Sequence, residues 1–217
     1  EYFNCELEIN EENAEAIWEQ CNDYIAKNEV NPQKLIESSS VTCVFTTNEV
    51  FDDLKTFEKI AEKGYKFKVI PAFRADKIMN IEAEKYNDFI SLVENETHKI
   101  NTLSDLEEAL RERLAEFKKV GTRAADLALE SVYPIAEKSA AEKAFSKRRK
   151  GGTLTAGEIV EFKGYLTYFL MKLYAENGLA TELHVGAMRN NNTEMLLKLG
   201  LDTGYDSISE EDGIKNI

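Results

Sequence analysis

Short apolar runs alternate with longer amphipathic segments along this chain, and the alternation predicts strands separated by helices. Residues 41–47 (VTCVFTT) form a compact β-branched run that is typical of a buried strand. Residues 66–73 (KFKVIPAF) predict a second strand, with Pro71 near its end, where the hydrogen-bond ladder can stop. Residues 122–130 fit a strand or a helix by pattern alone, and we interpret them as the third strand. Residues 180–187 predict the fourth.

Apolar residues recur at helical spacing before and between these runs. Asn10 is expected to cap a helix that runs to about Ala26. The pair Asn31-Pro32 predicts the start of a short second helix, because proline suits a first-turn position that lacks a hydrogen-bond partner. Residues 50–62 are amphipathic and predict a third helix.

Two capping boxes predict where the later helices begin. The first joins Ser104 with Glu107, and the second joins Thr155 with Glu158 ahead of a long helix. Between them, another helix is predicted to end near Lys150, where a basic cluster stands at the helix C-terminus.

Strand–helix alternation of this kind favours parallel strands joined by crossover helices. Four such units amount to half of a (β/α)8 barrel, and an open four-stranded parallel sheet fits the pattern equally well. We divide the chain into residues 1–40, a helical lead-in segment, and residues 41–217, a partial (β/α) barrel.

The composition narrows the class of protein. The chain has 217 residues, of which 43% are hydrophobic, which is enough for one domain or for part of a larger one. Its 27 basic and 40 acidic side chains give a net charge of -13, which disfavours nucleic-acid binding. No apolar run reaches the roughly 18 residues of a membrane span. We find no signal peptide, and three cysteines without paired spacing indicate free thiols, so a cytoplasmic protein is expected.

Candidate chemistry gathers where the predicted strands end, because functional residues of α/β folds collect at the carboxyl ends of strands. Asp76 could also be a first-turn helix residue, a lone strand histidine is more often structural, and an asparagine run could be a surface turn. From the residues alone, the chain is an α/β domain with a polar pocket of undecided chemistry. The rule selects positions at four places: Thr46, Thr47, Asn48 and Glu49 after the first strand, Arg74, Asp76 and Lys77 after the second, Arg123 and Asp126 near the third, and His184, Arg189, Asn190, Asn191 and Asn192 in or after the fourth.

Four segments then carry a family resemblance. Residues 182–208 (ELHVGAMRNNNTEMLLKLGLDTGYDSI) are very similar to the signature stretch of uronate isomerases. Residues 43–54, 70–82 and 120–129 resemble three further segments of that family, in the same order and spacing. The likeness covers essentially the whole chain and corresponds to the central portion of the family sequence.

The resemblance implies a partial TIM-type barrel of the amidohydrolase-like, metal-dependent class, holding strands two to five of the family barrel. It implies aldose–ketose isomerisation of hexuronates, D-glucuronate to D-fructuronate and D-galacturonate to D-tagaturonate, by an enzyme of which this chain is a fragment, inactive alone. A divalent metal, zinc or manganese, is expected in the full-length protein, with its main ligands outside this chain. The implied partners are the hexuronate substrate and further copies of the same protein, with neither nucleic acid nor membrane.

The resemblance also assigns roles to the strand-end residues. Asp126 and His184 are expected to be catalytic, and His184 is also a candidate metal ligand. The residues expected to bind substrate are Arg74, Asp76, Arg189, Asn190 and Asn191.

Two departures from the family pattern keep other functions open. Phe57 and Leu127 stand where the family has histidines, and neither side chain carries a proton or binds a metal. The losses favour a non-catalytic module that binds a sugar acid, or an isomerase or hydrolase that acts on a different sugar.

Overall fold

The computed structural model describes residues 2–209, which fall into two compact units. One unit holds the residues up to 45 together with residues 56–70, and the other holds residues 46–55 and those from 71 onward. These units are not separated at residue 40, and the division of the chain at that position stays a prediction.

The first unit contains α1 (Ala14–Lys27), α2 (Pro32–Ser38) and most of α3 (Lys55–Glu62). The predicted start of α2 is confirmed, because the side chain of Asn31 accepts a hydrogen bond from the backbone N–H of Lys34 at 2.9 Å. None of the residues of α1 is buried, and Trp18 on this helix is 69% exposed.

The predicted cap of α1 at Asn10 is wrong. The side chain of Asn10 accepts a hydrogen bond from the backbone N–H of Asn13 at 2.9 Å, and the helix begins only at Ala14. Asparagine stabilises a tight turn by the same kind of bond that it makes at a helix start, so the residue type did not distinguish the two.

Four strands form one sheet, in the order β1-β2-β3-β4, and β3 is parallel to both of its neighbours. All four predicted strands are therefore present. The expectation that the first is buried is wrong, since β1 lies at an edge of the sheet and its Phe45 is 47% exposed. The strands are β1 (Cys43–Glu49), β2 (Lys68–Arg74), β3 (Ala124–Leu129) and β4 (Ala180–Val185).

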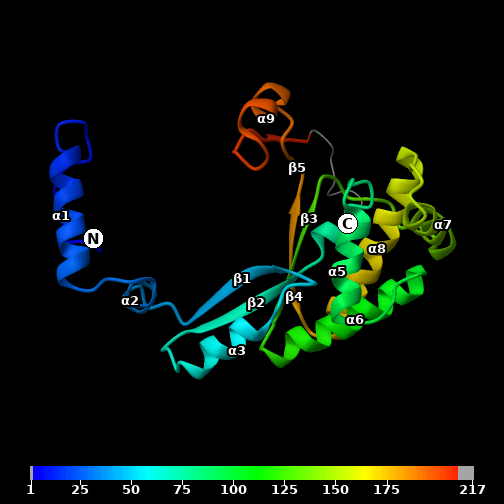
Figure 1. The fold of residues 1–217 in the computed structure, drawn as a ribbon, viewed down its shortest axis with the longest axis horizontal. Coiled ribbons are helices and arrows are strands. Elements are labelled where there is room, and N and C mark those ends of the chain that lie inside the picture. Colours follow the sequence, from blue (N-terminus) through cyan, green and yellow to red (C-terminus); the bar gives the residue numbers. More distant parts are fainter. Residues whose placement is uncertain (1, 210–217) are drawn as a thin grey trace. The chain divides into compact units, whose positions relative to one another are not determined.

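Helices of the second unit cover one side of β3 and β4, as Figure 1 shows for α5 to α8. Side chains alternate across a strand, so Phe73, Ala125 and Leu127 enter the core beneath these helices while Asp126 points to the opposite side. The helices are α4 (Asp76–Met79), α5 (Tyr86–Glu96), α6 (Leu103–Lys119), α7 (Lys138–Arg149) and α8 (Ala156–Glu176).

One of the two predicted capping boxes is displaced. Thr155 and Glu158 cap α8 as expected, whereas α6 is capped by Thr102 and Asp105. Glu107, which was assigned to that cap, pairs instead with Lys138 at 2.8 Å. Two overlapping Ser/Thr-x-x-Asp/Glu frames occur there, and Leu103 belongs in the buried face of α6, which selects the earlier frame.

The loop after β3 packs tightly on α8. A Cβ atom built on Gly164 would lie 2.0 Å from the backbone oxygen of Pro134. The backbones of α8 and the loop are therefore in direct contact at this position, with no room for a side chain. Next to it, the buried ammonium of Lys163 lies 5.5 Å from the ring centroid of Tyr133 and pairs with Glu82.

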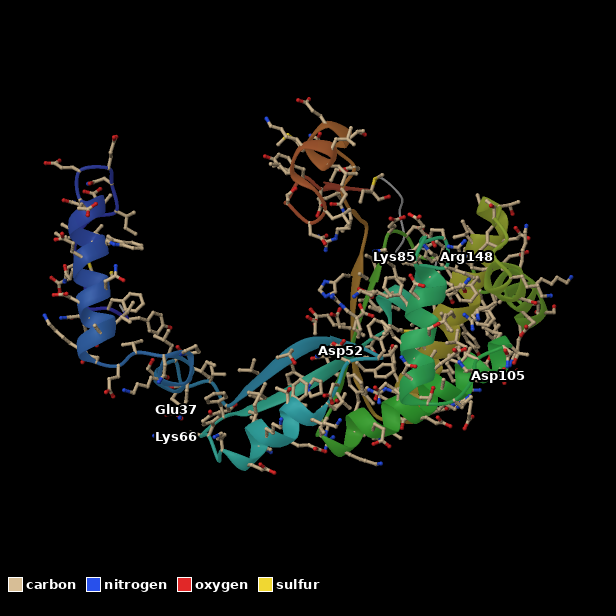
Figure 2. All side chains as sticks on the ribbon, viewed as in Figure 1. Glu37, Asp52, Lys66, Lys85, Asp105 and Arg148 are labelled. Carbon is tan, nitrogen blue, oxygen red and sulfur yellow. The ribbon has the colours of Figure 1, made fainter. Side chains whose placement is uncertain are left out.

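Arginine side chains tie the helices to the loops between them. Arg148, at the end of α7, donates to the backbone oxygens of Ala83 and Glu84, and Figure 2 shows it beside Lys85. The buried Arg113 of α6 donates to the backbone oxygens of Val50 and Asp52, in the turn that follows β1. The first contact fixes the loop between α4 and α5, and the second fixes the turn at the end of β1.

After β4 the chain forms a small antiparallel pair, β5 (Ala187–Met188) with β6 (Ser207–Ile208), around α9 (Thr193–Leu199). Figure 1 places α9 beyond the carboxyl end of β4. Among the described residues, no helix combines the length and apolar character that a membrane span requires.

Candidate functional site

The register of the parallel strands places polar side chains in neighbouring rows on one side of the sheet. Arg74 of β2 lies opposite Asp126 of β3, which in turn lies opposite Glu182 of β4. One row further toward the carboxyl ends, Ala128 lies opposite His184. Residues paired across parallel strands point to the same face, so these side chains share one surface.

Arg74 bridges two carboxylates at the end of its strand. Its Nη2 lies 2.8 Å from Asp126 Oδ2, and its Nε lies 3.1 Å from Asp76 Oδ2. Asp76 also accepts a hydrogen bond from the backbone N–H of Ala128 at 2.9 Å, which joins the end of β2 to β3. Burial raises the pKa of Asp76, and the nearby charge of Arg74 opposes that rise.

Asp126 is 3% exposed, yet neither of its oxygens receives a hydrogen bond of good geometry from the described residues. The contact with Arg74 is therefore electrostatic at hydrogen-bond distance, and the carboxylate keeps the capacity to accept from a further donor. A buried carboxylate in this state costs free energy unless a cation stays beside it.

His184 stands against the same carboxylate. Its Nε2 lies 3.1 Å from Asp126 Oδ1 and 3.5 Å from Glu182 Oε1, and its side chain is 47% exposed. A carboxylate held against an imidazole orients the ring. The pair has the arrangement of a proton-transfer group with one side open to a ligand.

Arg74, Asp76 and His184 border a pocket of about 430 Å³, which is within the size range of small-molecule sites. Both cationic and anionic groups contribute, so the pocket suits a polar ligand. Its polar lining consists of Arg74, Asp76, Asn80, Glu130, His184, Arg189 and Asp202.

Arg189 reaches this pocket from the segment after β5. Its Nη1 lies 2.8 Å from Asp206 Oδ2, and its side chain is 59% exposed. The backbone N–H of Asn190 donates to Asp206 Oδ1 at 2.8 Å and is the largest cause, ahead of Arg189, of the lowered pKa of Asp206. The guanidinium is thus held from one side and exposed on another.

The side chains of the next two residues, both asparagines, make hydrogen bonds within the loop. Asn190 adopts a left-handed φ of 54°, and its side-chain oxygen accepts from the backbone N–H of Asp202 at 2.9 Å. Asn191 donates to the hydroxyl of Ser207. Among the described residues, those that line the pocket include neither asparagine, and their assignment to substrate binding stays a prediction.

The pocket also has lining residues that the strand pattern did not mark. Glu130 directly follows β3, so the strand-end rule contained the signal for it. Glu49, which that rule selects, ends β1 and does not line the pocket. Asn80 and Asp202 come from a helix end and a loop, where no pattern marked them. Arg123, which is close to Asp126 in sequence, precedes β3 and therefore lies at its amino end, away from the pocket.

The residues present do not complete a metal site. Within residues 2–209 there is no group of three histidine, cysteine or acidic side chains arranged to hold a metal ion. His184 as a metal ligand stays a prediction.

Comparison with known proteins yields one consistent family. The glucuronate isomerase family model matches residues 1–217. The uronate isomerase of Caldanaerobacter subterraneus subsp. tengcongensis is 42% identical over 212 residues, covering 96% of this chain and 46% of that protein. The uronate isomerase of Staphylococcus haemolyticus is 37% identical over 215 residues, covering 98% of this chain and 46% of its own length.

Solved structures agree on the fold. The uronate isomerase from Thermotoga maritima superposes with a TM-score of 0.87 at 29% identity, over 96% of this chain and 46% of that one. The glucuronate isomerase from Caulobacter crescentus gives a TM-score of 0.89 at 22% identity, over 100% of this chain and 46% of that one, and shows the fold alone. The predicted partial α/β barrel is confirmed, and the chain spans about half the length of these relatives.

Proposed function

The chain belongs to the glucuronate isomerase family, and from that membership we propose that it forms part of an enzyme that interconverts hexuronates. The proposed reactions are D-glucuronate to D-fructuronate and D-galacturonate to D-tagaturonate. The observation that carries the proposal is the meeting of Arg74, Asp76, Asp126 and His184 on one face of three neighbouring strands, next to a pocket that Arg74, Asp76 and His184 line. We further propose that residues 41–217 supply strands two to five of the whole barrel.

The two arginines have different roles in the proposed binding of a sugar acid. Arg74 forms ion pairs with both Asp76 and Asp126, so its positive charge is already balanced by carboxylates of the protein. Arg189 has one carboxylate partner and an exposed guanidinium, which leaves donors for the carboxylate of an open-chain hexuronate. The oxygens of Asp76 and Glu130 are then available for hydroxyl groups of the sugar.

The pair of His184 and Asp126 is suited to the proton transfer. Aldose–ketose isomerisation removes a proton from the carbon next to the carbonyl and adds one to the former carbonyl carbon. His184 takes that proton and returns it, while Asp126 stabilises the imidazolium that exists between the two steps. A hydroxyl proton moves to the carbonyl oxygen in the same exchange, so atoms and charge balance.

We place the divalent metal, zinc or manganese, and its main ligands outside the described residues. When bound, such an ion polarises the substrate carbonyl. The other parts of the proposal, namely binding, orientation and proton transfer, use only side chains of this chain.

A non-catalytic module that binds a sugar acid is the second candidate. The family histidines replaced by Phe57 and Leu127 were its support, yet both side chains are buried, and Leu127 lies in the core beneath the helices. Because it alternates with Asp126, this position points away from the pocket, and its replacement removes no proton carrier from the pocket. The geometry therefore favours the enzyme.

The direct test is turnover of D-glucuronate and D-galacturonate by the full-length protein, together with calorimetric binding of both. Turnover supports the enzyme, and binding without turnover supports the module. Absence of both would reject the sugar-acid site altogether.

Replacing Arg189 with methionine is expected to weaken hexuronate binding about 10- to 100-fold, because a charge-assisted bond to the substrate carboxylate is lost. The measurement is the KM of the full-length enzyme, supported by calorimetry. Lys198→Met, which removes an exposed cation from the nearby α9, is the matched control and should leave KM unchanged. Equal effects of the two variants would mean that only the overall charge matters.

A further inference from the structure

We infer that Glu49 is a positioning residue of this site, which acts on the pocket through Asp76 and Arg74 without lining it. The inference rests on the proposed function and names a residue that the family resemblance assigned no role. Its support is a fixed backbone, a carboxylate directed at the start of α4, and the charges gathered around it.

The backbone of Glu49 is held on both sides. Its own N–H donates to Asp52 Oδ2 at 3.1 Å, and the next N–H, of Val50, donates to the backbone oxygen of Arg74 at 3.0 Å. The buried Arg113 then donates to the backbone oxygen of Val50 at 2.6 Å. Figure 2 labels Asp52 in this turn. The side chain of Glu49 therefore starts from a defined point at the end of β1.

From that point the carboxylate reaches the helix that carries Asp76. Glu49 Oε2 lies 3.4 Å from the backbone nitrogen of Lys77, the residue after Asp76. The charged groups that act on it are Arg74 of β2, with Asp76 and Lys77 of α4. Asp52 approaches only the backbone N–H of Glu49. Asp76 and Arg74 both line the pocket, so the charge of Glu49 acts on two pocket residues.

This environment opposes ionisation of Glu49. Burial, followed by the charge of Asp76, raises the pKa of Glu49 to about 7, although the backbone N–H of Lys77 and the charges of Lys77 and Arg74 act in the other direction. Near neutral pH the side chain is therefore divided between its protonated and ionised forms. Burial likewise raises the pKa of Asp76.

The charge of Glu49 changes what Arg74 can hold. With Glu49 protonated, Arg74 balances two carboxylates, Asp76 and Asp126. Ionised Glu49 adds a third negative charge beside them, which repels Asp76 and lowers the positive potential that an anionic substrate meets. We therefore expect kcat/KM for a hexuronate to fall as pH rises through 7.

The test compares the full-length enzyme with its Glu49→Gln variant, which keeps the size and the acceptor oxygen but cannot ionise. Ionisation of Glu49 is expected to lower the wild-type kcat/KM about tenfold between about pH 6 and pH 8. The Glu49→Gln variant should not show this fall in its pH profile. Glu58→Gln, at an exposed position of α3, is the control and should keep the wild-type profile. A Glu49→Gln profile that matches wild type would overturn the inference.

Thermal unfolding gives a readout that does not need activity. A carboxyl with a raised folded-state pKa makes the folded protein less stable as pH rises from about 4.5 to 7, because the folded form then holds the extra proton. Glu49→Gln should therefore unfold at the wild-type temperature near pH 4.5 and at a higher one, by about 2 °C or more, near pH 8. An equal shift at both values would indicate a purely structural role and reject the inference.

The two proposals fail in different ways. Absence of hexuronate turnover in the wild type rejects the proposed function, while the pH-dependent unfolding difference still decides the ionisation of Glu49. If Glu49→Gln does not fold, Glu49→Asp replaces it, since it keeps a carboxyl and should shift the pH of the fall in kcat/KM rather than remove the fall. A fall that stays in place in Glu49→Asp would overturn the inference.

Discussion

Replacing Gly164 with alanine should destabilise the fold by about 3 kcal/mol or more, although it adds a single methyl group to a helix. The added carbon would lie 2.0 Å from the backbone oxygen of Pro134, and a backbone atom cannot rotate away as a flexible side chain can. Either α8 or the loop after β3 must move. Because Glu130 of that loop lines the pocket, a loss of activity should accompany the loss of stability.

The measurement is chemical denaturation of the full-length protein followed by circular dichroism. Gly157→Ala provides a control in the same helix, where the nearest atom to the new carbon is the hydroxyl of Thr155 at 4.0 Å. That variant should be neutral or gain up to about 1 kcal/mol, because alanine favours a helix more than glycine does. If both variants behave alike, the contact between α8 and the loop is looser than described.

Replacing Arg74 with methionine should have the largest combined effect on stability and activity. It leaves the carboxylates of Asp76 and Asp126 without their shared cation, and removing one partner of a buried ion pair costs about 3–5 kcal/mol. Asp126 would also lose the charge that balances it behind His184. Arg123→Met, at an exposed position of the amino end of β3, should cost little by comparison.

Acid should relieve the defect in Arg74→Met. Methionine cannot balance the carboxylates, so their protonation, already favoured for Asp76 by its raised pKa, removes the unpaired charge. The difference in the free energy of unfolding between wild type and variant should therefore shrink as pH falls toward about 4. A difference that is constant with pH would show that the lost packing of the arginine stem dominates.

The strands and the centre of the site were predictable because both depend on local patterns. Apolar runs of the length of a strand mark β2 and β3. Parallel strands have their carboxyl ends at the same edge of the sheet, whatever path the connecting helices take. That rule alone brought Arg74, Asp126 and His184 together. The alternation of Leu183, His184 and Val185 also gave the side to which the histidine points.

The remaining features depend on choices that the sequence presents as equivalent. Thr102 and Ser104 both begin a capping frame, and only the burial of Leu103 separates the two. The ion pair of Arg189 with Asp206 joins two residues that are 17 positions apart, and no periodic pattern indicates such a contact. The raised pKa of Glu49 likewise follows from burial and from Asp76, which is remote in sequence.

The exposure of Trp18 determines which spectroscopic signal can follow unfolding of this chain. It is the single tryptophan of the sequence, and it already lies largely in water on a helix without buried residues. Its fluorescence emission should therefore be red-shifted in the native state and change little when the barrel core melts. Tyr86 and Tyr174 are buried in that core, so ultraviolet difference absorbance of tyrosine would register the transition that indole emission misses.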